Sequence, residues 1–408
     1  MNVQSLDRST DIIVIGAGAA GMAAAVRAGE RGRHDLLLEK ADRPGRKIYA
    51  SGNGRCNLMN SSAPRYYGDP DFANDVLRQC GKDDLAAFFR RYGLLLAEET
   101  EGRIYPITFQ SGSVISSLRN AMELTSTTLV LNDAVQSAEK DTCGFCVHTV
   151  SGQTHTSKRL IIACGGAAQP KLGGNADGYR ILTSFGHTLI PVMPSLVPLN
   201  TDSRSISGLS GIRVRCGVTV LCGGKPVHHE EGEVLFTDYG VSGICVMQCA
   251  RFAAEGQTMI ELNLLRNAFP DREACIAELL RRKTIFSGLS PLCLLNGILP
   301  ERLSYAVLKQ AGAPLRGETA GETSEELIGR IADTGYAYRI TVTGNRGMDY
   351  AQVTAGGIDC AEFNASTMES RIVPGLYAAG EVLNVDGDCG GFNLMFAFAG
   401  GLTAGCAV

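Results

Sequence analysis

The chain has 408 residues, of which 45% are hydrophobic and 20% are charged, and its formal net charge at pH 7 is −4. A chain of this length can bury more than one core, so we expect two or three domains. The acidic balance argues against nucleic acid or an anionic membrane as the principal partner and favours a small molecule. Residues 1–10 are polar and lack the layout of a secretory signal, so we expect a cytoplasmic protein, with its oligomeric state left open.

The first predicted element is the apolar run 12–15, which is typical of a parallel strand buried on both faces. It leads into Gly-x-Gly-x-x-Gly at 16–21 and an Ala-rich helical stretch through Arg27, and a second apolar strand ends at Glu39. In such a β-α-β unit the glycines let backbone amides approach a pyrophosphate at the helix N-terminus. Glu39 is placed to accept hydrogen bonds from the adenosine ribose and would repel a 2′-phosphate, so we expect bound FAD or NAD and not NADP.

A second glycine-rich and basic loop, 43–57, follows directly after the ribose acid. NAD dehydrogenases do not usually need such a loop, whereas the ribityl chain and isoalloxazine of FAD extend beyond the pyrophosphate. We expect Arg46 and Lys47 to contact phosphate or ribose, and the segment 51–56 to follow the ribityl chain and flavin. This loop therefore favours FAD over NAD.

The glycine pattern at 16–21, Gly-Arg-Lys-Ile at 45–48 and Ser-Gly-Asn-Gly-Arg-Cys-Asn at 51–57 together resemble the YhiN and BaiN group of flavoproteins, which includes enzymes called aminoacetone oxidases. The resemblance covers nearly the whole chain. It implies that a short strand around Val135 presents its backbone to the adenine. It also implies that the strand 160–166 ends in a small-residue turn near FAD.

The strongest block of this resemblance is the C-terminal segment 375–394. Its residues predict a short apolar strand, a turn at Gly380 and Glu381, and an apolar helix from Asn393 onward. Asp386 is expected to hold a ribityl hydroxyl, and amides at the helix N-terminus are expected to face the part of the flavin that becomes negative on reduction. The helix is too short and too rich in glycine to span a bilayer, so we interpret it as a core helix.

The segment between these two blocks has a different pattern. Residues 212–221 alternate in part with period two and precede Gly223-Gly224, which predicts a β-hairpin. The stretches 274–280, 303–308 and 325–331 have helical spacing. We therefore expect a small β domain or barrel followed by a small helical subdomain, which the family resemblance also implies.

The predicted fold class is α/β, with a discontinuous Rossmann-type FAD-binding domain over 1–189 and 339–408. An inserted β-barrel-like domain is expected over 190–270 and a helical subdomain over 271–338. The predicted FAD contacts are Gly16, Gly18, Ala19, Ala20, Gly21, Glu39, Lys40, Arg46, Lys47, Ser51, Gly52, Asn53, Arg55, Cys56, Val135, Gly165, Gly380, Glu381, Asp386, Phe392, Asn393 and Leu394.

The inserted domain is expected to supply the substrate pocket. Asp238, at a position where the family commonly has His, and Tyr239 are the predicted proton donors. No second Gly-x-Gly-x-x-Gly unit follows Gly21, so a nicotinamide would visit the flavin face in turn with the substrate. We expect NAD(P)H to reduce the FAD, and the reduced flavin to deliver hydride to a small unsaturated or carbonyl-conjugated substrate.

Other functions remain open. The same absence of a nicotinamide domain suits a flavin amine oxidase that forms hydrogen peroxide, and an FAD-dependent redox sensor is a non-enzymatic alternative. Cys143 and Cys146 have the spacing of a thiol-disulfide oxidoreductase, although they lie far in sequence from the flavin segments. The histidines show no spacing typical of a metal site, and His228-His229 is interpreted as an exposed hairpin pair, so we expect no metal.

Overall fold

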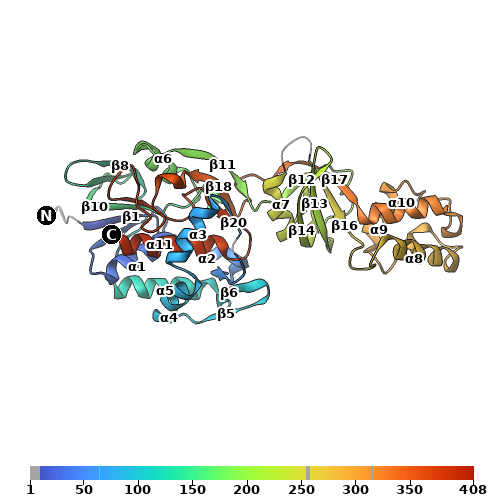
Figure 1. The fold of residues 1–408 in the computed structure, drawn as a ribbon, viewed down its shortest axis with the longest axis horizontal. Helices are drawn as coiled ribbons and strands as arrows, with labels where there is room; N and C mark the ends of the chain where they lie inside the picture. The colour runs from blue at the N-terminus through green and yellow to red at the C-terminus, as the bar shows by residue number, and fades with distance from the viewer. Residues whose placement is uncertain (1–9, 64, 254–257, 315) are drawn as a thin grey trace. The chain divides into compact units, whose positions relative to one another are not determined.

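The computed structural model of the protein describes residues 10–63, 65–253, 258–314 and 316–408. The chain forms two compact units, the first from residues 1–194 and 352–408 and the second from residues 195–351. In Figure 1 the blue N-terminal and red C-terminal segments belong to the same unit. The second unit is therefore an insertion into the chain of the first.

The first unit is built on a seven-stranded sheet with the order β7-β2-β1-β10-β9-β8, and β19 pairs with β10 beside this path. Strands β7, β2, β1, β10 and β19 are parallel, whereas β9 and β8 continue from β10 as an antiparallel meander. The sheet strands are β1 (Thr10–Ile15), β2 (Asp35–Leu38), β7 (Thr128–Val130), β8 (Val135–Lys140), β9 (Phe145–Thr149), β10 (Thr154–Ile162) and β19 (Leu376–Ala378).

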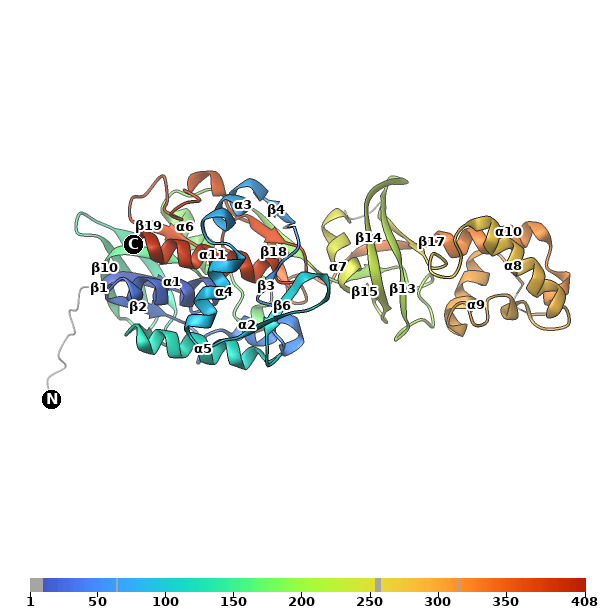
Figure 2. The ribbon, with the colours of Figure 1, turned by 60° about the horizontal axis from the view of Figure 1, so that its bottom comes forward.

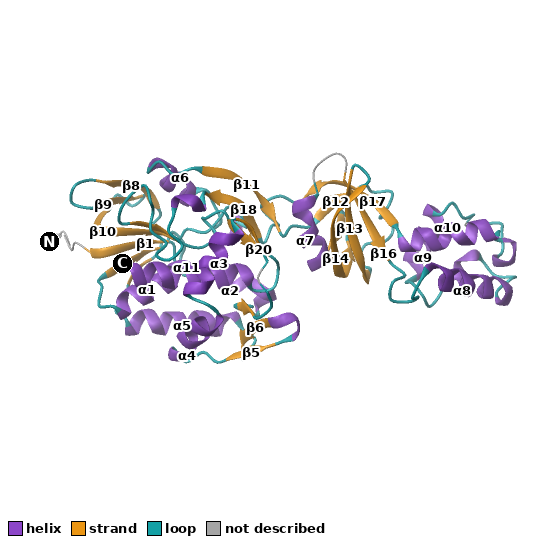
Figure 3. Ribbon diagram, viewed as in Figure 1, coloured by secondary structure: helices purple, strands orange, loops and turns teal. Residues whose placement is uncertain are grey.

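Helices and short strands surround this sheet (Figure 3). The helices are α1 (Ala19–Glu30), α2 (Arg46–Ala50), α3 (Pro70–Gln79), α4 (Lys82–Arg91), α5 (Ser111–Leu124), α6 (Asp177–Ser184) and α11 (Phe392–Ala407), with 3-10 turns η1 (Ser51–Gly54), η2 (Thr100–Gly102), η3 (Pro170–Leu172) and η7 (Cys360–Glu362). The short strands are β3 (Met59–Asn60), β4 (Tyr66–Gly68), β5 (Leu96–Glu98), β6 (Arg103–Pro106), β11 (Leu189–Ser195), β18 (Val353–Ile358) and β20 (Val385–Gly387).

The first and last helices, α1 and α11, lie side by side (Figure 2). Glycine makes this contact close, because a Cβ on Gly401 would lie 2.2 Å from the Ala20 carbonyl oxygen and one on Gly405 would lie 2.3 Å from that of Ala24. The C-terminal helix is buried, as its apolar sequence predicts. Over the part of the chain that the structure describes, none of the helices combines the length and apolar character needed to cross a membrane.

The second unit contains a closed barrel with the order β12-β15-β14-β13-β16-β17. Its strands are β12 (Leu199–Thr201), β13 (Arg213–Cys222), β14 (Lys225–Phe236), β15 (Gly240–Ser242), β16 (Thr258–Asn263) and β17 (Tyr338–Asn345). Strands β13 and β14 form the predicted hairpin, and Cys222 pairs with Lys225 across the two-glycine turn. Gly223 and Gly224 have φ of +56° and +79°, the left-handed pair that a tight hairpin turn requires.

The predicted helical part of the second unit is also present. It contains α8 (Arg272–Ile285), α9 (Glu301–Gln310) and α10 (Glu325–Tyr336), and the remaining short helices of the unit are α7 (Ile244–Cys249), η4 (Ala250–Phe252), η5 (Pro291–Leu294) and η6 (Ala320–Glu322). Two boundaries differ from the prediction: residues 190–194 belong to the first unit and, by a larger shift, residues 339–351 belong to the second unit and not to the C-terminal FAD segment. The reason for the larger shift is that β17 pairs with both β16 and β12 and so closes the barrel.

Candidate functional site

Glycines of the loop after β1 serve either close packing or the approach of a ligand to the backbone. A Cβ on Gly16 would lie 2.6 Å from the Ala163 carbonyl oxygen, and one on Gly21 would lie 1.8 Å from that of Gly16, so both positions are needed for packing. A Cβ on Gly18 or on Gly165 would meet nothing within 4 Å. Gly18 and Gly165 therefore border open space, as they must if a dinucleotide approaches the backbone here.

The N-terminus of α1 lies at this open position. Gly18 is its N-cap and offers no side chain to the first amides of the helix. The amides of the first turn, including those of Ala19 and Ala20, have no carbonyl partner within the helix. A pyrophosphate is the ligand that such amides and the helix dipole favour, so this end of α1 fits the phosphates of FAD.

Glu39 follows β2 and holds the glycine loop from the side. Its Oε2 accepts a hydrogen bond from the Ala17 amide at 2.8 Å, and its Oε1 accepts one from the Ala41 amide at 2.9 Å. A carboxylate has about four acceptor sites, so lone pairs remain for the ribose hydroxyls. The structure thus places the predicted adenosine acid beside the loop and adds a role in fixing it.

Lys47 and Glu381, both predicted FAD contacts, meet although they are 334 positions apart in the sequence. The Lys47 Nζ lies 2.8 Å from Glu381 Oε2, and Glu381 Oε1 accepts a hydrogen bond from the Thr354 amide at 2.9 Å. Thr354 Oγ1 in turn accepts the Ala168 amide at 2.9 Å. This chain of contacts ties the N-terminal basic loop to the C-terminal block.

The segment 51–56 has an unusual backbone. Gly52, Asn53 and Cys56 have φ of +56°, +55° and +58°, and the Ser51 hydroxyl donates to the Ile48 carbonyl at 2.7 Å. The Cys56 amide donates back to the Ser51 carbonyl at 3.0 Å, so the loop is closed on itself. Contact of this loop with the ribityl chain and flavin stays a prediction.

The remaining basic side chains contact protein groups. The Arg55 guanidinium lies 2.8 Å from Glu99 Oε1 and packs against two neighbouring aromatic rings, 4.5 Å from the centroid of Tyr105 and 4.6 Å from that of Phe109. Lys40 lies 3.8 Å from Asp177, and Arg46 donates to the Lys171 carbonyl at 3.0 Å. These contacts hold loops around the site, and a direct FAD contact by Lys40, Arg46 or Arg55 stays a prediction.

The C-terminal block approaches the glycine loop from its other side. A Cβ on Gly380 would lie 3.0 Å from that of Ala20 in α1, and Asp386 is only 2% exposed on β20. The Asn393 side chain accepts the Gly387 amide at 2.8 Å and donates to the Gly387 carbonyl at 2.8 Å. Asn393 therefore braces the entry to α11, and what it can offer a ligand is its backbone amide.

Other positions of the predicted site have simpler surroundings. Val135 is buried at the start of β8, where it pairs with Thr149. Phe392 is buried in the first turn of α11, and Leu394 is half-buried there. Gly391, the N-cap of α11, has φ of +111° and supplies no side-chain cap, so this helix end resembles that of α1.

The thiols next to these segments are held in the protonated state. Burial raises the pKa of Cys56 to about 12, and burial followed by the charge of Asp177 raises the pKa of Cys164 to about 12. Burial also raises the pKa of Cys389. Disulfide exchange needs a thiolate, so these surroundings disfavour thiol-disulfide chemistry at the candidate site.

The predicted proton donors lie in the second unit. Asp238 is exposed, and Tyr239 is half-buried, both in the turn between β14 and β15. The Arg346 guanidinium carbon lies 4.4 Å from the centroid of the Tyr239 ring and 4.3 Å from that of Tyr350. The role of Asp238 and Tyr239 stays a prediction, because the predicted FAD contacts all belong to the first unit.

A cavity of about 680 Å³ also lies within the second unit, between the barrel strand β13 and helix α8. Arg282 lines it and lies 2.8 Å from Glu278, whose pKa is lowered to about 2 by hydrogen bonds from Arg281 and Arg282. None of the residues predicted to bind FAD or to donate a proton lines this cavity.

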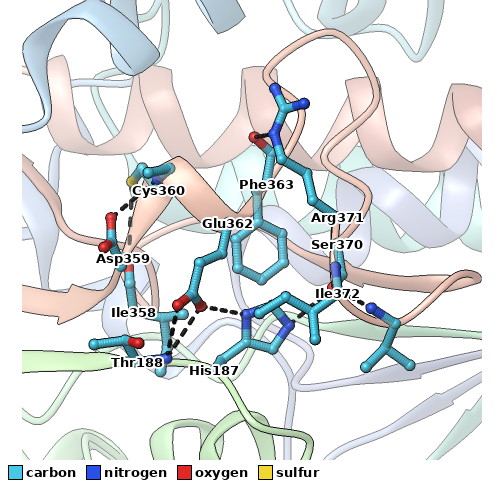
Figure 4. A network of polar contacts seen from close by, with 12 residues as sticks. His187, Thr188, Ile358, Asp359, Cys360, Glu362, Phe363, Ser370, Arg371 and Ile372 are labelled. Atoms are coloured by element: carbon cyan, nitrogen blue, oxygen red, sulfur yellow. Dashed lines mark hydrogen bonds and ion pairs between the residues drawn. The ribbon is translucent and has the colours of Figure 1, made fainter.

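A second polar network links a carboxylate, a histidine and a serine, as a hydrolase triad does, but its contacts are those of a structural network (Figure 4). His187 Nδ1 lies 2.7 Å from Glu362 Oε2, and His187 Nε2 lies 2.9 Å from the Ser370 hydroxyl oxygen. The His187 side chain is 0% exposed. The Ser370 hydroxyl accepts the amides of Ile372 and Val373 at 3.0 and 2.8 Å. Its lone pairs are thus occupied, so the network joins loops and offers no nucleophile.

The chain is similar to known proteins over almost its whole length. The chain matches the family model described as "HI0933-like protein Rossmann domain" over residues 10–407. It belongs to this family. The predicted resemblance to the YhiN and BaiN group is confirmed, and the protein is an FAD-dependent oxidoreductase with the predicted α/β fold.

Curated relatives match over almost their whole length. A "3-dehydro-bile acid delta(4,6)-reductase" of Clostridium scindens is 35% identical, with 97% of this chain and 98% of the relative covered. A "Ribosomal RNA dihydrouridine synthase" of Escherichia coli is 32% identical, with 95% of each chain covered. A relative of the same name from Haemophilus influenzae is 29% identical, with 97% of each chain covered.

Sequence reasoning missed two residues of the site. Thr354 links Glu381 to the turn at Ala168, and the glycine-rich strand run 353–357 is the signal that marks its neighbourhood. Tyr179 is the other: it is only 2% exposed, and burial and then the nearby charge of Glu381 raise the pKa of its phenol.

Proposed function

We propose that this enzyme uses NAD(P)H to reduce a carbon–carbon double bond conjugated to a carbonyl in a small organic substrate. The observation that carries the proposal is the reaction shared by the names of the relatives. A 3-dehydro bile acid with Δ4 unsaturation has a double bond conjugated to its 3-oxo group, and dihydrouridine is uridine reduced at the double bond conjugated to its 4-carbonyl. Both names therefore describe the reduction of an enone or enone-like system.

The chain's own residues support the binding of the cofactor. The α1 amides and the open face at Gly18 would hold the pyrophosphate, and Glu39 would hold the adenosine ribose. The Lys47–Glu381 pair joins the N-terminal basic loop to the turn at Glu381. The first turn of α11 would stabilise the negative charge of the reduced flavin. Bound FAD supplies the ring system through which a hydride passes from donor to acceptor.

The electron balance closes with a nicotinamide donor. NAD(P)H loses a hydride and becomes NAD(P)⁺, the β-carbon of the substrate gains a hydride, and the α-carbon gains a proton. We assign the supply of that proton to Asp238 or Tyr239 as a proposal. Since the nicotinamide and the substrate would use the same face in turn, ping-pong kinetics should follow.

Ribosomal RNA is the second candidate substrate, because two of the relatives carry that name. An RNA-binding insert would need a net basic surface to neutralise phosphates. Residues 195–351 contain 16 Lys and Arg against 17 Asp and Glu. This balance favours a small molecule over RNA.

Anaerobic stopped-flow spectroscopy tests the proposal. The purified yellow protein is mixed with NADH, NADPH or candidate amines, and the flavin absorbance is followed. We expect a nicotinamide to bleach the flavin and an enone to restore the colour, with a deuteride from labelled NAD(P)H recovered on the β-carbon.

Two outcomes would replace this function. Bleaching by an amine but not by NADH or NADPH, followed by recovery with oxygen and formation of hydrogen peroxide, would identify an amine oxidase. Reoxidation of the reduced enzyme by unmodified rRNA fragments but by no small enone, with dihydrouridine found by mass spectrometry, would identify RNA as the substrate.

A further inference from the structure

The register of β8 and β9 brings metal-binding side chains together on the sheet of the first unit. Glu139 and Cys146 are directly paired across the antiparallel ladder. His148 lies two residues beyond Cys146 on β9, and side chains two apart in a strand point to the same face. Strand pairing alone therefore gathers a carboxylate, a thiol and an imidazole on one face.

This face is the accessible side of the hairpin. The alternating residues Phe145 and Val147 are 1% and 0% exposed and pack into the core, whereas Cys146 and His148 are half-buried and Glu139 is exposed. An ion could thus reach the three side chains from solvent without a change in the core.

Two of the three separations between the ligand atoms match those of a tetrahedral metal site, and all three are within 4.8 Å. Cys146 Sγ lies 3.6 Å from His148 Nε2, and that nitrogen lies 3.2 Å from Glu139 Oε1. With Zn–S of about 2.3 Å and Zn–N and Zn–O of about 2.0 Å, a tetrahedral ion separates sulfur from nitrogen by about 3.5 Å and nitrogen from oxygen by about 3.3 Å. We propose that Glu139, Cys146 and His148 bind a zinc ion.

The neighbouring strand supplies the support that a histidine ligand needs. Thr154 of β10 is paired with His148, and its hydroxyl lies 3.1 Å from His148 Nδ1. With the Nδ1–H donating to this hydroxyl, the Nε2 lone pair faces the thiol and the carboxylate. Such outer contacts fix the tautomer and orientation of a metal-binding imidazole.

The proton of the Cys146 thiol competes with a metal ion for the sulfur. Burial, and then the carboxylates of Glu139 and Asp141, raise the pKa of the Cys146 thiol. A divalent ion would reverse this effect and displace the thiol proton to solvent, so affinity should increase with pH.

The choice of metal follows from the ligands. A thiolate and an imidazole select a borderline-soft ion over Mg²⁺ or Ca²⁺, and three protein ligands leave a fourth position for water. The histidine spacing in the sequence led us to expect no metal. That expectation missed this cluster because Glu139 comes from a neighbouring strand, which a search along the sequence for Cys and His spacing does not join.

Metal titration of the FAD-loaded full chain tests the proposal. The protein is stripped with a chelator under a phosphine reductant, and Zn²⁺ binding is measured by calorimetry. Co²⁺ is added in parallel, because its tetrahedral d–d bands lie beyond the flavin absorption. We expect one Zn²⁺ per chain, tighter binding at higher pH, and a thiolate-to-cobalt band.

Matched variants identify the ligands. Cys146→Ser and His148→Ala should each weaken Zn²⁺ binding about 100-fold or more, and Thr154→Val about tenfold. Cys143→Ser and His155→Ala are the controls, since Cys143 lies outside the cluster and His155 pairs with Val147 on the opposite face. Both should bind Zn²⁺ as the unmodified chain does, and the FAD absorbance of each variant reports its fold.

Several results would overturn the proposal. One is the absence of tetrahedral Co²⁺ bands in the unmodified chain. Another is Zn²⁺ affinity that is unchanged in folded Cys146→Ser and His148→Ala. A loss in Cys143→Ser as large as that in Cys146→Ser would also reject the ligand set.

Discussion

Removal of the Glu39 carboxylate should lower both the affinity for FAD and the stability of the apoprotein, because different contacts of Glu39 support each. Glu39→Ala deletes the acceptor of the Ala17 and Ala41 amides, at 2.8 and 2.9 Å. Ala17 is 0% exposed, so its amide loses most when the carboxylate is removed, whereas Ala41 is 9% exposed. An unsatisfied buried amide costs about 1–3 kcal/mol, and we expect this loss in the free energy of unfolding of the apoprotein.

The loss in FAD affinity is separate, because it comes from the ribose hydroxyls. Hydrogen bonds to a charged group contribute about 1.5–3 kcal/mol, which corresponds to a Kd increased roughly ten- to hundredfold. Urea unfolding of the apoprotein measures the first loss, and quenching of FAD fluorescence measures the second. Glu39→Gln keeps one acceptor oxygen, so it should show smaller losses of both kinds.

Asp11→Ala is the matched control. Asp11 also accepts one backbone amide, that of His34 at 3.2 Å, but it lies at the opposite end of β1 from the glycine loop. Its FAD Kd should remain within about twofold of the unmodified value, since distant sites act independently. If folded Glu39→Ala bound FAD as tightly as this control, the contacts of Glu39 would stabilise the glycine loop only, and the assignment of Glu39 to the ribose would be wrong.

Gly21→Ala should prevent stable folding, because its Cβ would lie 1.8 Å from the Gly16 carbonyl oxygen. Gly18→Ala should fold, lose about 1 kcal/mol in the free energy of unfolding and bind FAD weakly. Thermal melts and FAD titration distinguish the two variants. Lys47→Ala and Glu381→Gln should show a coupling of about 0.5–3 kcal/mol in a double-mutant cycle of stability, and additive losses would contradict the pairing. Burial raises the pKa of Asp35 from 3.8 to about 6, so the free energy of unfolding should fall as pH rises between these values. The free energy of unfolding of Asp35→Asn should therefore exceed that of the unmodified chain by about 3 kcal/mol at pH 8. Below pH 3.8 the two should be equal, and urea unfolding in each pH range would show this.

Local patterns in the sequence predicted the elements that depend on neighbouring residues. The β1-α1-β2 unit, the glycine-glycine hairpin of the barrel and the buried helix α11 all agree with the structure. In each case the signal is short-range: apolar periodicity, a glycine where φ is positive, or an acid after a strand. The boundary near 339 was missed because the sequence of β17 has the same pattern as a strand of the FAD-binding sheet. Only its pairing with β16 shows that it belongs to the barrel.

The tertiary structure decided which polar groups meet. Lys47 and Glu381 were both assigned to FAD from the sequence, and only the fold shows that they also bind each other across 334 positions. In the same way, Cys146 and His148 lie two positions apart in the sequence, but the register of β9 against β8 is what brings Glu139 to Cys146. The physical reason is that secondary structure follows from local sterics and burial, whereas a hydrogen bond or a metal site needs atoms within about 3 Å of each other. Segments distant in the sequence reach that separation only after the sheet has been paired and packed.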